Sequence, residues 1–405
     1  SARGVLGRMG TAHLQANRTR YKVTHETFGG IKDVKISGLE EMMLQRFRPA
    51  SRRVVRVEIV SELVSSLPSL VMEALIFGGV IVMLLYLMTA HGSIEAALPV
   101  FATFALAGYR LMPALQRIYR GLAKLRVTRA SLQSLVADHR TLAPMVVAEK
   151  PAGRDVPSLV PKRSISLKNV SYTYPKADGP AVRDLSLQID AKSTVAFVGA
   201  TGSGKTTTVD ILLGLLSPQE GGLYVDGRLI RDEDLRNWQQ AIGYVPQHIY
   251  LSDESIAGNI AFGVPPKSVD LEAVERAARA ARLHEFITTE LPSGYETEVG
   301  ERGVRLSGGQ RQRIGIARAL YHDPDVLILD EATSALDNAT ERLVMEAVGE
   351  LGGQKTVVLI AHRLSTVRNC QRIFLLDRGG LLDSGTYDDL CEGSAMFRKL
   401  AAADL

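Results

Sequence analysis

The chain has 405 residues, enough for two or three domains. Hydrophobic residues make up 46% of it and the mean hydropathy is +0.05, which is apolar for a soluble enzyme but low for an all-membrane protein. The net charge of +4 gives no support to a nucleic-acid partner. Two cysteines, Cys370 and Cys391, are too few for a disulfide framework or a metal site, so we expect reduced thiols facing the cytoplasm.

Residues 1–58 are polar and basic, and they predict one or two long solvated helices. They end in a cluster of arginines: Arg46, Arg48, Arg52, Arg53 and Arg56. A charge run usually marks a solvated face, but an apolar stretch follows this one at once. The sequence opens with Ser1 and shows no signal-peptide pattern, so we expect its N-terminal part to be missing.

Two apolar stretches come next, at 59–90 and 94–116. Residues 74–90 carry no charge, and together with 67–72 they exceed the roughly 20 residues that cross a bilayer. The second stretch is weaker and by itself fits a span or a buried core helix. The loop between them has no Lys or Arg, whereas basic residues flank both outer ends. The positive-inside rule therefore predicts a transmembrane hairpin with both outer ends in the cytoplasm.

Two ionisable residues, Glu73 and Arg110, lie inside this predicted hairpin. At a rise of about 1.5 Å per residue, both lie roughly 25 Å from its outer tip and so at a similar depth. Charge inside a membrane is costly and usually faces a partner or a water-filled path. Two interpretations stay open: Arg110 reaches the inner headgroups and pairs with Glu73 structurally, or the two handle a substrate.

The composition divides the chain into three parts. Residues 1–140 are expected to form an all-α, partial transmembrane domain. Residues 141–163 carry four prolines without clear periodicity and predict a linker. Residues 164–405 alternate between strand and helix patterns and predict an α/β domain.

A phosphate-binding loop organises the α/β domain. Residues 199–206 fit the pattern G-x-x-x-x-G-K-[ST], between an apolar strand at 194–198 and a helix at 207–216. The backbone N–H groups of such a loop cradle phosphate oxygens, while the lysine reaches the β- and γ-phosphates and the hydroxyl of Thr206 binds Mg²⁺. A Gly/Ser-rich turn of another α/β domain is the alternative. The residues predicted to hold the nucleotide are Gly199, Ala200, Thr201, Gly202, Ser203, Gly204, Lys205, Thr206 and Thr207.

Two carboxylates complete the pattern of a P-loop nucleotidase. The apolar strand 325–330 ends in Asp330, and Glu331 follows directly. Asp330 is placed to hold Mg²⁺, through water. Glu331 is placed to orient and deprotonate the attacking water.

The stretch Leu306-Ser-Gly-Gly-Gln310, followed by a helical run at 311–320, resembles the signature of the ATP-binding cassette family. Ser307, Gly308, Gly309 and Gln310 at a helix N-terminus form an anion site. The resemblance implies that this site holds the γ-phosphate of an ATP bound on the opposite subunit, so that two domains enclose two nucleotides.

The resemblance implies roles for four more residues. Tyr174 matches the aromatic that stacks on adenine, with Tyr172 as the alternative. Gln247 matches the glutamine that touches Mg²⁺ and water, and His362 the switch histidine that contacts the γ-phosphate. Asp337, in 334–337, matches the loop that contacts the partner subunit.

Residues 297–303 resemble a segment of the family's exporters, in which a membrane domain precedes the nucleotidase in one chain. The two predicted spans resemble the last two of that layout, which places Leu6–Ala16 near the second coupling helix. Residues 27–40 and 109–117 are similar to bacterial flippases of lipid-linked oligosaccharides, which suggests that Arg110 holds a lipid pyrophosphate.

These patterns predict an ATP-driven exporter or flippase of lipid-linked or amphipathic substrates, using ATP and Mg²⁺ and working with a second copy or a homologous half-transporter. The expected place is the bacterial inner membrane, multi-pass, with the nucleotidase in the cytoplasm, membrane lipid as a partner and no nucleic acid. A drug or peptide exporter fits the same motifs. A non-transporting fragment that only binds or slowly hydrolyses ATP also stays open, whereas a soluble cassette ATPase or an importer does not fit one cassette joined to a hairpin.

Overall fold

The computed structural model describes residues 2–91, 94–142, 159–300, 303–330, 338–361 and 364–403. The chain divides into two compact units, Ser1–Ala148 and Glu149–Leu405. The division falls inside the linker predicted at 141–163, most of which lies outside the described residues. Each unit is described here by itself.

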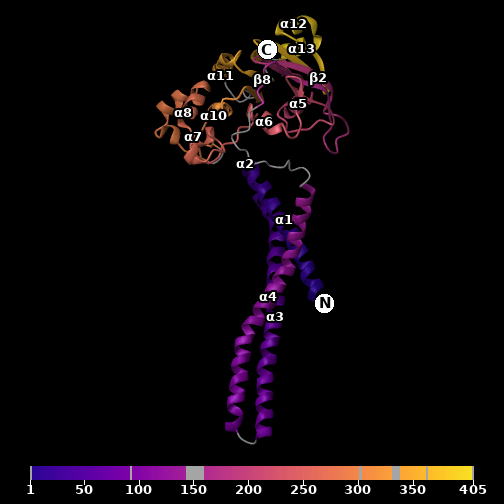
Figure 1. The fold of residues 1–405 in the computed structure, drawn as a ribbon, viewed down its shortest axis with the longest axis vertical. Coiled ribbons are helices and arrows are strands. Elements are labelled where there is room, and N and C mark those ends of the chain that lie inside the picture. The colour runs from indigo at the N-terminus through magenta and orange to yellow at the C-terminus, as the bar shows by residue number, and fades with distance from the viewer. Residues whose placement is uncertain are drawn as a thin grey trace. The chain divides into compact units, whose positions relative to one another are not determined.

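The N-terminal unit is all helical, as the polar and apolar helix patterns predict. It contains three long helices and one short one: α1 (Ala2–Gly29), α2 (Ile31–Ile36), α3 (Glu40–His91) and α4 (Ile94–Leu142). Helix α1 packs against both α3 and α4 (Figure 1). Arg18 of α1 donates a hydrogen bond to Ser134 of α4 at 2.7 Å, and Arg46 of α3 forms an ion pair with Glu26 of α1 at 3.3 Å.

Helices α3 and α4 lie side by side as the expected helical hairpin (Figure 1). A Cβ atom added to Gly108 would touch Ile76 Cγ2 at 3.4 Å, so the two helices approach closely at this level. No helix in the described part of the chain has both the length and the apolar character needed to cross a membrane. The two spans expected at 59–90 and 94–116 stay predictions; in the structure these residues belong to helices α3 and α4.

The described residues of this unit include one short helix, which lies outside residues 6–16. Residues 6–16, expected near a coupling helix, lie inside the unbroken helix α1. The short helix is α2 (Ile31–Ile36), which joins α1 to α3 at the end of their antiparallel pair. Gly38 follows it with φ of +62°, a left-handed conformation that a glycine adopts without strain and that turns the chain into α3. The expected position of residues 6–16 near a coupling helix stays a prediction.

The C-terminal unit is an α/β domain with two sheets. A four-stranded antiparallel sheet has the order β2-β1-β4-β5, with β1 (Ser164–Tyr172), β2 (Val182–Asp190), β4 (Glu220–Val225) and β5 (Arg228–Leu229). A six-stranded sheet has the order β10-β9-β3-β8-β7-β6, with β3 (Thr194–Val198), β6 (Ile242–Val245), β7 (Val326–Asp330), β8 (Thr356–Ile360), β9 (Arg372–Asp377) and β10 (Gly380–Gly385). Within the larger sheet every neighbouring pair is parallel except β9 and β10.

The larger sheet is buried on both faces, because alternate residues of its strands enter two different cores. In β3, Val195 and Phe197 face the core shared with the antiparallel sheet, and Ala196 and Val198 face the core shared with the helices. Strands covered on both faces read as continuous apolar runs, which is how 194–198 and 325–330 read in the sequence.

Helices surround these cores. Helices α5 (Lys205–Leu212) and α6 (Leu235–Gln240) contribute to the core of the antiparallel sheet, where Trp238 is fully buried. The other core is shared with α7 (Ile256–Ile260), α8 (Leu271–Ala280), α9 (His284–Glu290), α10 (Gly308–Leu320), α11 (Asn338–Leu351), α12 (Tyr387–Gly393) and α13 (Ala395–Ala403). The 3₁₀ turns are η1 (Pro266–Ser268), η2 (Gly294–Glu296) and η4 (Leu364–Val367).

Candidate functional site: a phosphate cradle at the carboxyl edge of a parallel sheet

The predicted P-loop joins the end of β3 to the start of α5. Gly204 caps α5 in the left-handed region at φ of +97°, and a Cβ atom there would lie 2.7 Å from the Ala181 carbonyl oxygen. A Cβ atom at Gly199 would lie 2.2 Å from the Leu376 carbonyl oxygen. Both positions therefore require glycine, because the loop passes too close to neighbouring backbone for a side chain. This close packing holds the loop in its tight turn before α5.

Two polar side chains of the loop are buried inside this turn. Lys205 is 5% exposed, and its Nζ donates hydrogen bonds to the carbonyl oxygens of Gly199 at 2.7 Å and Ala200 at 3.1 Å. The hydroxyl of Ser203 is buried without a hydrogen-bond partner among the described residues. A buried, unsatisfied hydroxyl is unfavourable unless something binds it. Phosphate oxygens satisfy this hydroxyl, and the exposed Thr206 at the start of α5 suits Mg²⁺, so the loop fits the expected nucleotide.

The parallel strands bring the other predicted residues to the same edge of the sheet. Asp330 at the end of β7 pairs with Ile360 of β8, which pairs with Phe197 of β3 just before the P-loop. Asp330 and Phe197 are thus two strands apart, about 10 Å. Gln247 follows the end of the next strand, β6, and is exposed. Glu331, Asp337 and His362 lie outside the described residues.

Asp330 is 7% exposed, and it contacts a residue that the sequence motifs did not indicate. Tyr244 of β6 donates its hydroxyl to Asp330 Oδ2 at 3.4 Å. Burial, together with the nearby carboxylates of Asp330 and Asp210, raises the pKa of Tyr244 to about 12. Tyr244 therefore stays protonated and can orient the Asp330 carboxylate at neutral pH. Burial also raises the pKa of Asp210.

Tyr174 lies beside the P-loop, and Tyr172 does not present an open ring. The Tyr174 hydroxyl is 3.3 Å from Thr207 Oγ1, and 40% of the residue is exposed. Tyr172 is 9% exposed and packs its ring edge-to-face against Tyr174 at 5.0 Å. Of the two candidates for an aromatic surface under a base, Tyr174 has the accessible face.

The signature residues begin helix α10 and are bonded to each other. Ser307 is the N-cap; its Oγ accepts a hydrogen bond from the Gln310 backbone N–H at 3.2 Å, and the Gln310 Oε1 accepts one from the Ser307 N–H at 2.8 Å. This capping box satisfies two donors that a helix end otherwise leaves unpaired. Helix α10 packs on α7, α8 and β6, so the signature belongs to the helical side of the unit.

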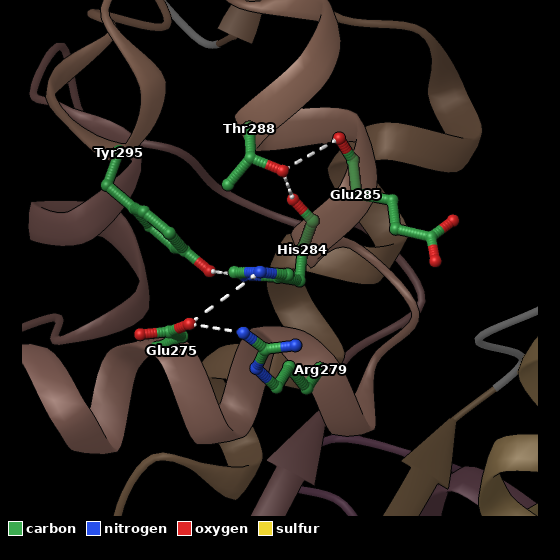
Figure 2. A network of polar contacts seen from close by, with 6 residues as sticks. All are labelled: Glu275, Arg279, His284, Glu285, Thr288 and Tyr295. Atoms are coloured by element: carbon green, nitrogen blue, oxygen red, sulfur yellow. Dashed lines mark hydrogen bonds and ion pairs between the residues drawn. The ribbon is translucent and has the colours of Figure 1, made fainter.

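A polar network lies directly before the exporter-like segment 297–303 (Figure 2). His284 Nδ1 is 2.8 Å from the Tyr295 hydroxyl, and His284 Nε2 is 3.6 Å from Glu275, which also pairs with Arg279 (Figure 2). Burial and the Glu275 carboxylate raise the pKa of Tyr295. The network joins α8, α9 and η2, and η2 ends one residue before 297–303 begins.

In the helical unit the structure brings Glu73 and Arg110 to the same level. Because Gly108 faces Ile76 in an antiparallel hairpin, Arg110 lies opposite the turn that contains Glu73. Both side chains are exposed, and the described residues record no ion pair between them. The two residues thus lie at the same level of the hairpin, and their roles stay predictions.

Two residues at the P-loop were missed by sequence reasoning. The Gly379 N–H donates to the Ser203 carbonyl oxygen at 3.1 Å, and Tyr244 holds Asp330. Two signals in the sequence could have indicated them: the Gly379-Gly380 pair after strand β9, and the polar Tyr244 inside the apolar strand β6. Neither residue belongs to a local motif, because the order of the strands in the sheet brings each of them to the site.

A P-loop, a buried aspartate two strands away at the same sheet edge and a helix-capping LSGGQ define a nucleotidase of the ATP-binding cassette class. Residues 182–334 match the family model described as ABC transporter. Residues 182–334 therefore belong to the ABC transporter family, and the helical unit followed by this domain matches the fold of an ABC exporter.

The relatives support this assignment over nearly the whole chain. The chain is 36% identical to an ATP-dependent lipid A-core flippase of Saccharophagus degradans over 93% of its own length and 62% of that protein. It is 35% identical to heavy metal tolerance factor 1 of Caenorhabditis elegans over 92% of its length and 46% of that protein. A solved structure of a bacterial Atm1-family ABC exporter with ATP bound matches 99% of this chain and 71% of that chain, with 28% identity and a TM-score of 0.77. The chain thus spans about three fifths of the lipid A-core flippase it matches.

Proposed function

We propose that this chain is a subunit of an ATP-driven exporter or flippase that moves a lipid-linked or amphipathic substrate across a bacterial inner membrane. The observation that carries the proposal is the phosphate cradle. Two of its glycines, Gly199 and Gly204, leave no room for a side chain, its Ser203 hydroxyl is buried without a hydrogen-bond partner among the described residues, and the loop shares a sheet edge with Asp330. Relatives that match the helical unit as well as the ATP-binding domain include several lipid A-core flippases, which supports an amphipathic lipid as cargo.

In this proposal the P-loop binds the phosphates of ATP through its N–H groups, the Ser203 hydroxyl and Lys205. The Lys205 side chain exchanges its hydrogen bonds to the Gly199 and Ala200 carbonyl oxygens for contacts with the phosphates. Thr206, Asp330 and Gln247 would hold Mg²⁺, which would neutralise charge on the phosphates. Glu331 accepts a proton from the attacking water, and His362 contacts the γ-phosphate. Ser307 and the N–H groups of the signature bind the nucleotide held by a second copy, across a contact that includes Asp337.

ATP binding is coupled to movement of the helical unit because ATP binds the closed and open arrangements of the paired domains with different affinities. ATP shifts the pair of domains toward the closed arrangement only by the difference between its affinities for the closed and open arrangements. Hydrolysis removes that difference and lets the pair reopen. The helical unit then alternates between its two arrangements once per cycle.

Glu331→Gln tests the hydrolytic half of the proposal. The variant should bind ATP normally, because the amide keeps the size of the side chain, but it loses the general base and with it about 100-fold or more of the turnover. Glu346→Gln, an exposed glutamate on α11, is the matched control and should keep full turnover. Near-normal hydrolysis by Glu331→Gln would refute the assignment.

The cargo is tested by ATPase activity in liposomes with and without a polyprenyl-pyrophosphate oligosaccharide or a lipid A-core. Stimulation that is lost in Arg110→Ala but kept in Arg117→Ala, two turns further along α4, supports lipid transport with Arg110 as a cargo contact. Activity indifferent to both lipids in all proteins removes the flippase and leaves a drug or peptide exporter, as the multidrug-export relative of Bacillus subtilis would favour.

A further inference from the structure

The arginine cluster at 46–56 divides into two groups in the structure. Arg46 and Arg53 are seven residues apart, two helical turns, and both line a hollow between α1 and α3. Arg48 points elsewhere and forms an ion pair with Glu41 at 3.0 Å. Arg52 does not line the hollow. The run is therefore more than a solvated face.

The hollow exists because small side chains meet where α1 and α3 pack. Ala16 and Ala50 are 5% and 8% exposed and form its floor. Its volume is about 560 Å³, within the range of small-ligand pockets. We call it the arginine groove, and it is lined by Gln15, Ala16, Arg18, Thr19, Arg46, Pro49, Ala50 and Arg53.

The arginine groove carries excess positive charge in a fixed arrangement. Three arginines are among its lining residues, and the described lining residues include no aspartate or glutamate. Arg18 is held by its hydrogen bond to Ser134 at 2.7 Å. Arg46 pairs with Glu26 at the rim at 3.3 Å, and Glu26 is shared with Lys22 at 3.7 Å. Among the described residues, Glu26 is the acidic partner recorded for these arginines, and it offsets a single charge, which leaves an anion site.

We propose that the arginine groove binds a phosphate group, supplied by the headgroup of an anionic phospholipid or by free phosphate. Guanidinium groups bind phosphate oxygens in bidentate fashion, and a basic pocket between helices at the cytoplasmic end of an apolar stretch suits a lipid headgroup. Arg53 lies six residues before Ile59, where the apolar stretch begins. The groove is built by the helical unit alone and does not depend on hydrolysis at the P-loop.

The test measures binding of dioctanoyl phosphatidic acid, dioctanoyl phosphatidylcholine and inorganic phosphate to the purified chain in detergent. Arg46→Gln/Arg53→Gln should lower the affinity for phosphatidic acid at least about tenfold, since each arginine contributes to headgroup binding. Arg48→Gln/Arg52→Gln removes the same charge from the same helix outside the groove and should change it less than about twofold. Because the P-loop is identical in both variants, its own affinity for phosphate cancels in the comparison.

A second pair of variants tests for the opposite effect, tighter binding of phosphatidic acid. Glu26→Gln releases Arg46 and should tighten phosphatidic acid binding severalfold, whereas Glu41→Gln, which releases Arg48, should not. A variant that merely destabilised the helices would weaken binding, so tightening separates a binding role from a structural one.

The outcomes are decisive. Phosphatidic acid bound at least tenfold more tightly than inorganic phosphate assigns the groove to a lipid headgroup, and equal affinities assign it to free phosphate. Equal losses in the two arginine pairs, or wild-type binding no stronger than that of phosphatidylcholine, overturn the proposal. A chain that hydrolyses ATP but fails this test keeps its proposed function, and a chain that binds phosphate here but lacks Glu331-dependent hydrolysis keeps only the groove.

Discussion

The two phosphate-facing elements of the ATP-binding domain are built in opposite ways. In the P-loop, glycines allow close backbone approach, and the Ser203 hydroxyl is buried without a hydrogen-bond partner among the described residues. In the signature, Ser307 and Gln310 satisfy each other in a capping box. One element is incomplete without a ligand, whereas the other is already satisfied within its own helix.

In the proposed ATP site this difference would give the two elements different roles. The P-loop holds its shape through backbone packing within one chain, so we expect a single copy to bind nucleotide. The Ser307 hydroxyl only accepts in the capping box, and its hydrogen stays available for a phosphate oxygen. The signature thus adds a donor without breaking its cap, which suits a late contact with a nucleotide held elsewhere.

The largest expected effect comes from Gly199→Ala. The new Cβ atom would lie 2.2 Å from the Leu376 carbonyl oxygen and 2.6 Å from Ser203 Oγ, so the loop has to move. We expect a loss of about 3 kcal/mol in stability and at least about tenfold in ATP affinity, the equivalent of one charged hydrogen bond.

Gly202→Ala is the matched control in the same loop. It meets nothing within 4 Å and costs only its left-handed backbone at φ of +81°, about 1 kcal/mol. Chemical unfolding and nucleotide titration measure both variants. Equal effects at the two positions would contradict the close-packing account of the P-loop.

Ser307→Ala tests the other side of the comparison. It removes the N-cap of α10 and should lower stability by about 1 kcal/mol. ATP affinity of a single copy should not change, while ATPase activity of the assembled protein should fall. Ser307→Thr keeps the cap and restores stability. A loss of single-copy ATP affinity as large as that of Gly199→Ala would show that the signature serves its own chain's nucleotide.

Tyr295→Phe probes the support of the segment before the signature. The change removes the hydrogen bond between His284 and Tyr295, 2.8 Å long, and should cost about 1 kcal/mol. A double-mutant cycle with His284→Gln measures the coupling between the two side chains. Additive effects would mean that the contact contributes nothing of its own.

The smallest expected effect on stability at neutral pH comes from Cys370, which lies away from the P-loop and the signature. Burial raises the pKa of this thiol from 9.0 to about 12. The folded state therefore keeps a proton that the unfolded chain releases, so stability is unaffected below pH 9 and falls as the pH rises from 9 toward 12. Thiol labelling at pH 8 should modify the half-buried Cys391 before Cys370. Faster labelling of Cys370 would show that its site opens in the native state.

Local sequence determined the motifs of this protein. The P-loop, the strand ending in Asp330 and the signature each depend on a few adjacent residues, since a tight turn, a buried strand and a helix cap are short-range structures. The exporter family was predicted from the same motifs. Glu331, Asp337 and His362 are sequence predictions in the same sense, and their roles stay predictions.

Tertiary structure decided what these motifs meet. The order β3-β8-β7-β6 brings Asp330 and Gln247 to the edge where the P-loop lies, and it adds Tyr244. Helix packing separated Arg46 and Arg53 from Arg48, and it put the short helix at α2. Strand order and helix contacts bring together residues that are far apart in the chain, and the local periodicity of the sequence does not predict such contacts. The sequence therefore predicted the kind of chemistry, and the fold decided which side chains lie together at the site.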